Sequence, residues 1–128
     1  MTRRAVSTSS APAAQGPYSQ AIATDELLFC AGQIGVDPAT GQLADGLEGQ
    51  TTQVLRNLQA VLDAAGCTFA DVVKTTCFLA DINDFTAFND IYVGFMTDPA
   101  PARSTFQVAA LPKGARVEIE AIAVRPRG

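Results

Sequence analysis

Two glutamates near the C-terminus are the first residues of this chain whose type and spacing could do chemistry. Residues 116–124 read Arg-Val-Glu-Ile-Glu-Ala-Ile-Ala-Val, and their alternation predicts a β-strand with Glu118 and Glu120 on one face. The opposite face would carry Val117, Ile119, Ala121 and Ala123. Two carboxylates on an otherwise apolar strand can orient water or move protons. Glutamates also protect the outward face of an edge strand, so that explanation stays open.

An arginine upstream of these glutamates supplies a candidate anion-binding group. Arg103 lies in Pro101-Ala102-Arg103-Ser104, before a predicted strand, in a chain that contains no histidine for acid–base chemistry. The planar guanidinium matches a carboxylate through two parallel hydrogen bonds, whereas lysine would supply only a point charge. We therefore expect Arg103 to bind a substrate carboxylate while a nearby glutamate positions water. The structural alternative is a buried ion pair between Arg103 and Glu118 or Glu120.

The composition indicates a single domain that associates with copies of itself. The 128 residues suffice for one hydrophobic core, so we expect one domain over 1–128. Hydrophobic residues make up 48% of the chain and charged residues only 17%, which is more apolar surface than a small two-layer monomer can hide. The net charge of −4 argues against a nucleic-acid partner, which would require a basic surface.

The same sequence predicts a soluble, cytoplasmic protein without a metal centre. Arg3 and Arg4 are followed by small and polar residues, so we expect no secretory signal, and no segment reaches the roughly 20 apolar residues of a membrane span. Cys30, Cys67 and Cys77 are widely spaced, and without histidine they complete no zinc site. We expect three reduced thiols, with Cys30 and Cys77 as small core residues rather than nucleophiles.

Hydrophobic periodicity predicts the elements that must position these groups. Residues 1–16, rich in Ala, Ser, Thr and Pro, predict an extended lead-in. Apolar residues at helical spacing predict helices over 48–65, ended by Gly66, and over 84–96, capped by Asn83 or Asp84. The remaining apolar runs predict strands over 19–23, 27–31 (ended by 32–35), 72–80, around Arg103, and over 116–124.

This order of elements predicts an α+β fold in which two helices lie on one face of a mixed sheet of five or six strands, and we expect a six-stranded sheet. Two helices can cover only one face of such a sheet, so the other, apolar face must pack against further copies of the chain in a closed, symmetric oligomer. Glu118 and Glu120 would lie at such a boundary, where burial requires hydrogen bonds or a cation. A cleft between subunits is therefore where we expect the chemistry.

Five motifs are spread along nearly the whole chain. They are Gly16-Pro17-Tyr18-Ser19-Gln20-Ala21, Gly32-Gln33-Ile34, Asn89-Asp90-Ile91-Tyr92, Pro101-Ala102-Arg103-Ser104 and Val117-Glu118-Ile119-Glu120-Ala121-Ile122-Ala123. Together and in this order they resemble the RidA/YjgF family of reactive-intermediate deaminases. The resemblance implies a chorismate-mutase-like fold, a homotrimer with clefts between subunits, and hydrolysis of 2-iminopropanoate, 2-iminobutanoate or the enamine 2-aminoacrylate to 2-oxo acids and ammonia. It implies neither a metal nor a cofactor.

The resemblance also assigns residues to the site. It implies that Arg103 binds the substrate carboxylate, that Glu118 orients the attacking water, and that Tyr18 forms a wall of the cleft. Thr105 would contribute main-chain groups to substrate binding. The other residues that would line or shape the pocket are Ser19, Gly32 and Gln33. Glu120 stays open as a site residue, since a polar network on the strand explains it better.

Two departures from the family pattern bear on substrate range. The loop Met96–Ala100 looks shorter than in many relatives, and Ala100 replaces an aromatic residue, which is expected to widen the pocket. Gly35 replaces a proline and is expected to loosen the turn beside the cleft. Two other functions stay open, namely a dedicated catabolic enamine deaminase of the same superfamily and a non-catalytic ligand-binding or RNA-related member.

Overall fold

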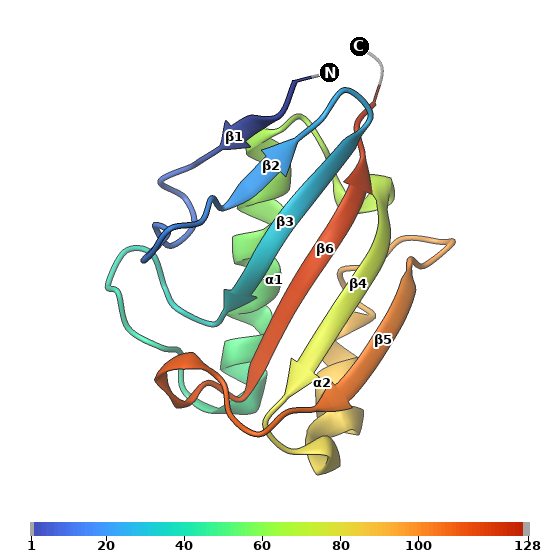
Figure 1. Ribbon diagram of the computed structural model, residues 1–128. Helices are drawn as coiled ribbons and strands as arrows, with labels where there is room; N and C mark the ends of the chain where they lie inside the picture. Colours follow the sequence, from blue (N-terminus) through green and yellow to red (C-terminus); the bar gives the residue numbers. More distant parts are fainter. Residues whose placement is uncertain (1, 127–128) are drawn as a thin grey trace.

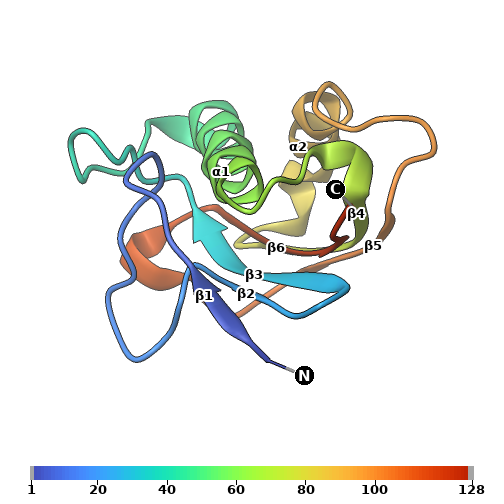
Figure 2. The ribbon, with the colours of Figure 1, turned by 90° about the horizontal axis from the view of Figure 1, so that it is seen from above.

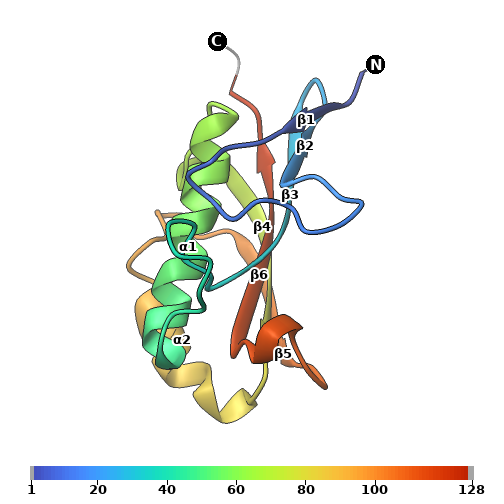
Figure 3. The same cartoon turned by 90° about the vertical axis from the view of Figure 1, so that its left-hand side faces the viewer.

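Within the described residues, 2–126 of the computed structural model, six strands form one mixed sheet that two helices cover on one face (Figure 1). The elements are β1 (Arg4–Val6), β2 (Ala21–Ala23), β3 (Leu27–Ile34), α1 (Gly46–Ala64), β4 (Val72–Leu79), α2 (Phe85–Tyr92), β5 (Ala102–Gln107) and β6 (Val117–Val124). The strands follow the order β1-β2-β3-β6-β4-β5, and every neighbouring pair is antiparallel except β4 and β5. Figures 2 and 3 show both helices on one side of the sheet. The predicted α+β fold is confirmed.

The strand that carries the two glutamates, β6, lies in the middle of the sheet between β3 and β4. Its side chains alternate as predicted, with Glu118 and Glu120 on the face that no helix covers, called the open face below. The side chains buried beneath the helices are those of Val117, Ile119, Ala121 and Ala123. Explaining the glutamates as edge protection is therefore wrong, because β6 has a hydrogen-bonded neighbour on each side.

Helix α1 packs a stripe of buried apolar side chains against the sheet. Its apolar residues recur at helical spacing, and five of them are fully buried, namely Val54, Leu55, Leu58, Val61 and Leu62. Burying a side chain of this size stabilises the fold by roughly 1.5–3 kcal/mol. This stripe therefore fixes α1 on β3 and β6, the strands that it contacts. No helix in the part of the chain that the structure describes is both long and apolar enough to cross a bilayer.

The N-terminal part of the chain contributes more to the sheet than predicted. The lead-in contains β1, which pairs with β2 and supplies the sixth strand. The strand predicted over 19–23 is shorter, because pairing begins only at Ala21. The next strand does not end at Ala31, as predicted, but continues through Gly32 to Ile34. A β-bulge between Cys30 and Gln33 absorbs the irregularity that looked like a strand end.

The second helix is shorter than predicted. It ends at Tyr92 rather than at residue 96, with Gly94 in the turn that follows. A 3₁₀ turn, Ile82–Asp84, precedes it, and the Asp81 side chain caps this turn by accepting the N–H of Asn83. Asp84 occupies the N-cap position of α2, one of the two positions predicted, but its side chain makes no capping hydrogen bond within residues 2–126. The Asp84 carboxylate instead pairs with the Arg116 guanidinium at 3.0 Å.

Gly35 packs tightly against α1 instead of loosening the turn after β3. A Cβ atom at this position would lie 2.7 Å from the Cα and from the carbonyl oxygen of Gln50. Asn57 on α1 strengthens the same junction, because its amide donates to the carbonyls of Ile34 at 3.2 Å and Val36 at 2.9 Å. The expected looser turn is therefore wrong, since the missing side chain is what lets β3 end directly against the helix.

We expect Gly35→Ala to destabilise the protein by about 1–3 kcal/mol, because the new methyl group would displace the backbone of α1. Gly49→Ala on α1 is the matched control. Its methyl group would meet only the Ala44 side chain, at 3.7 Å, and alanine favours a helix over glycine by roughly 0.5–1 kcal/mol. Urea unfolding measures both free energies. Equal stability of Gly35→Ala and the wild type would contradict this account of the junction.

Candidate active site

Arg103 lies on the edge strand β5 and points toward the helices. It is in register with Thr75 of β4, whose buried hydroxyl lies 2.7 Å from the Tyr92 hydroxyl on α2. Nη1 of Arg103 donates to Oδ1 of Asn89 at 2.7 Å. The guanidinium carbon lies 4.7 Å from the ring centre of Tyr92 and 5.4 Å from that of Phe85. One hydrogen bond and two aromatic rings therefore hold the guanidinium against α2.

Glu118 lies half-buried on the open face. It is in register with Ile34 on β3 and with Phe78 on β4. Burial, and secondly the charge of Glu120, raises the pKa of the Glu118 carboxyl above its usual range. Such a carboxyl is better suited to exchange protons near neutral pH than an ordinary glutamate. Glu120 is exposed beside it, in register with Thr76.

Gly32 leaves the space that the Glu118 carboxylate occupies. A Cβ atom at position 32 would lie 2.1 Å from Oε2 of Glu118 and 2.9 Å from its Cδ. The carboxylate therefore rests directly on the backbone of β3, next to the β-bulge. This contact explains why a glycine lies inside the strand.

Arg103 and Glu118 lie on opposite faces of the sheet. Their partners on β4, Thr75 and Phe78, are three residues apart, so the side chains at these two positions point to opposite sides. Figure 3 shows the helices, toward which Arg103 points, on one side only. Within residues 2–126 Arg103 pairs with neither glutamate, so the alternative ion pair is not formed. A single chain does not bring this cation and this carboxylate to one substrate.

Tyr18 and Ser19 belong to the segment that leads into β2. Figure 3 shows this segment extending on the open side of the sheet. Tyr18 is 53% exposed, and its hydroxyl accepts the N–H of Gln15 at 3.3 Å. Both residues line a shallow pocket of about 410 Å³, whose other lining residues are Arg3, Pro17, Ile22, Phe29, Cys30 and Ala31. Tyr18 is thus placed on the same side as Glu118.

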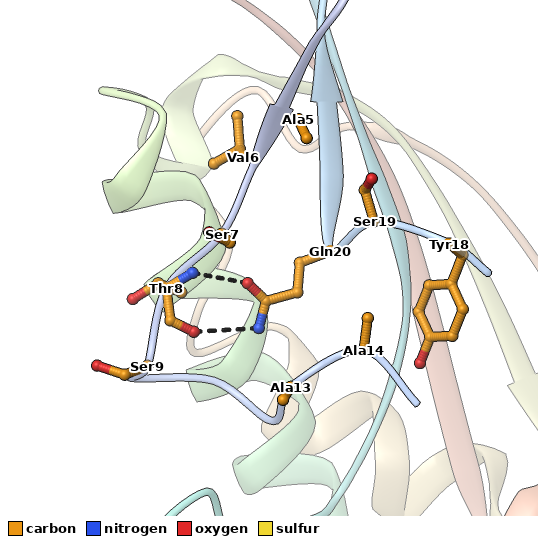
Figure 4. Close-up of a pocket in the computed structure, with 10 residues that line it drawn as sticks. All are labelled: Ala5, Val6, Ser7, Thr8, Ser9, Ala13, Ala14, Tyr18, Ser19 and Gln20. Carbon is orange, nitrogen blue, oxygen red and sulfur yellow. Dashed lines mark hydrogen bonds between the residues drawn. The ribbon is translucent and has the colours of Figure 1, made fainter. Parts of the chain in front are cut away.

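A second pocket, of about 430 Å³, lies between this segment and the lead-in that contains β1 (Figure 4). It is lined by residues 5–9, 13, 14 and 18–20. Its centre is Gln20, whose Oε1 accepts the N–H of Thr8 at 2.7 Å and whose Nε2 donates to the carbonyls of Thr8 and Pro12. The Gln20 amide is therefore fully used in tying the lead-in to β2. Its function here is structural, because it holds the chain that carries Tyr18 and Ser19.

The remaining predicted residues, Gln33 and Thr105, point toward the helices. Gln33 is 7% exposed and in register with buried Ile119. Thr105 follows Arg103 by two residues, so both side chains lie on the same face of β5, and its buried hydroxyl has no nitrogen or oxygen hydrogen-bond partner among residues 2–126. Gln33 is thus on the covered side of the sheet, away from Glu118, whereas Thr105 stays beside Arg103.

The residues that hold Arg103 were not predicted from the sequence. Phe85, Asn89 and Tyr92 are spaced i, i+4 and i+7, which places them on one face of α2. The motif Asn89-Asp90-Ile91-Tyr92 contains two of these residues, Asn89 and Tyr92, and could have pointed to them. Its chemical meaning depends on Arg103 lying opposite, and only the pairing of β4 with β5 shows that.

The three thiols lie in surroundings that disfavour the thiolate form. All three cysteines are free and buried. Burial raises the pKa of Cys30 to about 12 and that of Cys77 to about 11, and it also raises the pKa of Cys67. Among residues 2–126 no three His, Cys, Asp or Glu side chains come together as metal ligands.

We expect Glu118→Gln to be more stable than the wild type at about pH 7. The raised pKa of Glu118 means that its contribution to stability is present below the unfolded-state pKa and lost as pH rises through the folded-state pKa. The difference between variant and wild type should therefore shrink as pH falls to about 4. Melting temperatures measured across this range test it, with exposed Glu120→Gln as the control that changes less. A Glu118→Gln protein no more stable than the wild type at neutral pH would contradict the effect of burial.

Comparison with known proteins gives consistent similarities. The family model described as Endoribonuclease L-PSP matches residues 8–125. The 2-iminobutanoate/2-iminopropanoate deaminase of Capra hircus is 55% identical over 98% of this chain and 92% of its own length. The human protein of the same name is 52% identical over the same shares.

Solved structures resemble this chain in fold as well as in sequence. RidA from the Antarctic bacterium Psychrobacter sp. PAMC 21119 has a TM-score of 0.92 and 44% identity, covering 94% of this chain and 98% of that one. E. coli TdcF, solved with bound serine, has a TM-score of 0.92 and 41% identity, covering 96% of this chain and 99% of that one.

Proposed function

This chain belongs to the endoribonuclease L-PSP family, the family of the YjgF and RidA proteins, and we infer that it is a 2-iminobutanoate/2-iminopropanoate deaminase. Relatives named for this activity match it over nearly its whole length. One observation at the site carries the assignment, namely that Arg103 is held by uncharged groups and so keeps its charge for a substrate carboxylate. The products are a 2-oxo acid and ammonia.

The reaction requires only a small set of groups. The carbon of a protonated imine is already a strong electrophile, so binding in the correct orientation supplies much of the rate. Arg103 binds the carboxylate of the imino acid. Water, oriented by Glu118, attacks the imine carbon and forms the C–O bond while the Glu118 carboxylate accepts a proton. The proton passes to the nitrogen of the tetrahedral intermediate. The Glu118 carboxylate then accepts the hydroxyl proton as the C=O bond forms, the C–N bond breaks, and ammonia leaves.

The proposed site lies between two chains of a homotrimer, with Arg103 from one chain and Glu118 and Tyr18 from its neighbour. Two observations support this arrangement. The cation and the carboxylate occupy opposite faces of the sheet in one chain. The open face also presents apolar side chains that a neighbouring copy can cover, namely Ile22, Leu27, Phe29, Phe78, Phe106, Ile122 and Val124. Ser19, Gly32 and the main chain of Thr105 would shape the cleft.

We expect Arg103→Ala and Glu118→Ala to lose deaminase activity separately and to restore it together. Imine made in situ from threonine by a pyridoxal-phosphate dehydratase is the substrate, and loss of the imine is followed. Each variant alone should form folded trimers that add little to the uncatalysed rate. In a mixed trimer one cleft of three would receive the wild-type Arg103 and Glu118. Equal amounts refolded together should therefore recover about a quarter of the wild-type rate.

The control for subunit exchange is wild type refolded with Arg103→Ala in the same proportions. Light scattering during size exclusion establishes the number of chains. Absence of any recovery in exchanged mixed trimers would contradict the shared site, and full activity of Arg103→Ala alone would contradict the deaminase mechanism itself.

We expect Gly32→Ala to lower kcat at least tenfold while the protein stays folded. The new methyl group meets the end of the flexible Glu118 side chain, so the carboxylate moves rather than the backbone. Gly49→Ala, far from the proposed cleft on α1, is the activity control. Steady-state kinetics and melting temperatures distinguish displacement of the Glu118 carboxylate from unfolding of the protein. An unchanged kcat would mean that the place of the carboxylate is unimportant.

RNA cleavage is the competing function, because the family description names an endoribonuclease. The net charge of −4 and the absence of histidine argue against it here. Tight, strongly salt-dependent binding of RNA by the purified protein would reverse this judgement. Three free thiols fit a reducing compartment, and we propose the cytoplasm.

A further inference from the structure

Asn89 is the nearest polar partner of Arg103, and it is neutral. We propose that Asn89 is a positioning residue that orients the Arg103 guanidinium without neutralising it, so that the site recognises its substrate by the negative charge of the carboxylate. This inference rests on the proposed function and goes beyond it, because it assigns a residue and a physical basis to substrate discrimination.

The hydrogen bond from Arg103 fixes the orientation of the Asn89 amide. A guanidinium has five N–H donors and no acceptor, so it is the oxygen of Asn89 that faces Nη1, at 2.7 Å. This contact uses one donor of Arg103 and leaves the others for an anion. Asn89 is half-buried on α2, a helix that the core holds in place through buried Phe88. The tether is therefore anchored to a rigid element.

The rings beside Arg103 restrict the plane of its guanidinium. Tyr92 is 5% exposed, and its hydroxyl and that of Thr75 lie 2.7 Å apart. That bond fixes the Tyr92 ring, whose centre lies 4.7 Å from the guanidinium carbon. Phe85 lies on the same side of α2, one helical turn before Asn89. Rings and amide together hold the guanidinium in one orientation.

Among residues 2–126, the groups of α2, β4 and β5 that lie against Arg103 are uncharged at neutral pH. From α2 these groups are Phe85, Asn89 and Tyr92, and from the sheet they are Thr75, Cys77 and Thr105. Burial raises the pKa values of the Tyr92 hydroxyl and the Cys77 thiol, which keeps both neutral. Asp90, next to Asn89 in the chain, is exposed and makes no ion pair with Arg103 within residues 2–126. The cation is thus positioned by dipoles and rings alone.

An aspartate at position 89 would keep the shape and the hydrogen bond but place a negative charge on Arg103. The aspartate would then form an ion pair with Arg103, and a substrate carboxylate would have to compete with that aspartate for the guanidinium. Asparagine is therefore the acceptor that fixes the orientation of the Arg103 guanidinium and leaves its positive charge available to the substrate.

The test compares Asn89→Asp with Asn83→Asp, which adds the same charge at an exposed position in the turn before α2. We measure kcat and KM with 2-iminobutanoate and the inhibition constants of 2-oxobutanoate and its neutral amide. Asn89→Asp should raise KM at least tenfold with kcat changed less than threefold, and the preference for carboxylate over amide should fall by a similar factor. Asn83→Asp should match the wild type, and neither variant should melt at a lower temperature.

Asn89→Ala keeps the site neutral but removes the tether, so it should raise KM and lower kcat while retaining the preference for carboxylate over amide. It also serves if Asn89→Asp does not fold, in which case unchanged kinetics of Asn89→Ala would overturn the inference. A folded Asn89→Asp protein with wild-type KM and wild-type preference for carboxylate would overturn it directly. If Arg103→Ala is also fully active, the proposed function fails. If Arg103→Ala is inactive while Asn89→Asp is normal, only the inference about Asn89 fails.

Discussion

The burial of only one face of the sheet is the constraint on which the rest of this structure depends. Helices α1 and α2 cover one side, so each strand must sort its side chains by alternation into a buried and an open set. On β6 this sorting leaves Glu118 among apolar neighbours that no helix covers, and on β5 it sends Arg103 toward α2. The packing that stabilises one chain thus separates its two charged groups, and it also leaves an apolar surface that favours association.

Strong periodicity made α1 and β6 predictable, because a single buried face imposes the periods of 3.6 and 2.0 directly on the residue types. The position of β6 in the sheet was not predictable in this way. It is the last strand in the chain but lies between β3 and β4, and strand order depends on long-range pairing that local pattern does not encode. The short strand β1 was missed for the same reason, since three residues without alternation become a strand only by pairing with β2.

At the site, the charged residues could be identified from the sequence and the neutral ones could not. Arg103 and Glu118 stand out as charges in apolar surroundings, and resemblance to a known family gave each a function. No alternation around Arg103 shows which face of the sheet it occupies, and the parallel pairing of β5 with β4 decides this. Asn89 and Tyr92 likewise carry no distinctive chemistry until that pairing places them against a cation. Residues that act through another residue are the ones for which local sequence holds least information.

The contact between Gly32 and Glu118 also bears on how such a site changes over generations. While glutamate occupies position 118, any side chain at position 32 enters the space of its carboxylate. If position 118 first becomes a shorter residue, position 32 is free to accept a side chain. Once it has done so, a returning glutamate no longer fits in its former place. Position 118 must therefore change before position 32. A lineage that has made both substitutions cannot regain the original carboxylate by reversing position 118 alone.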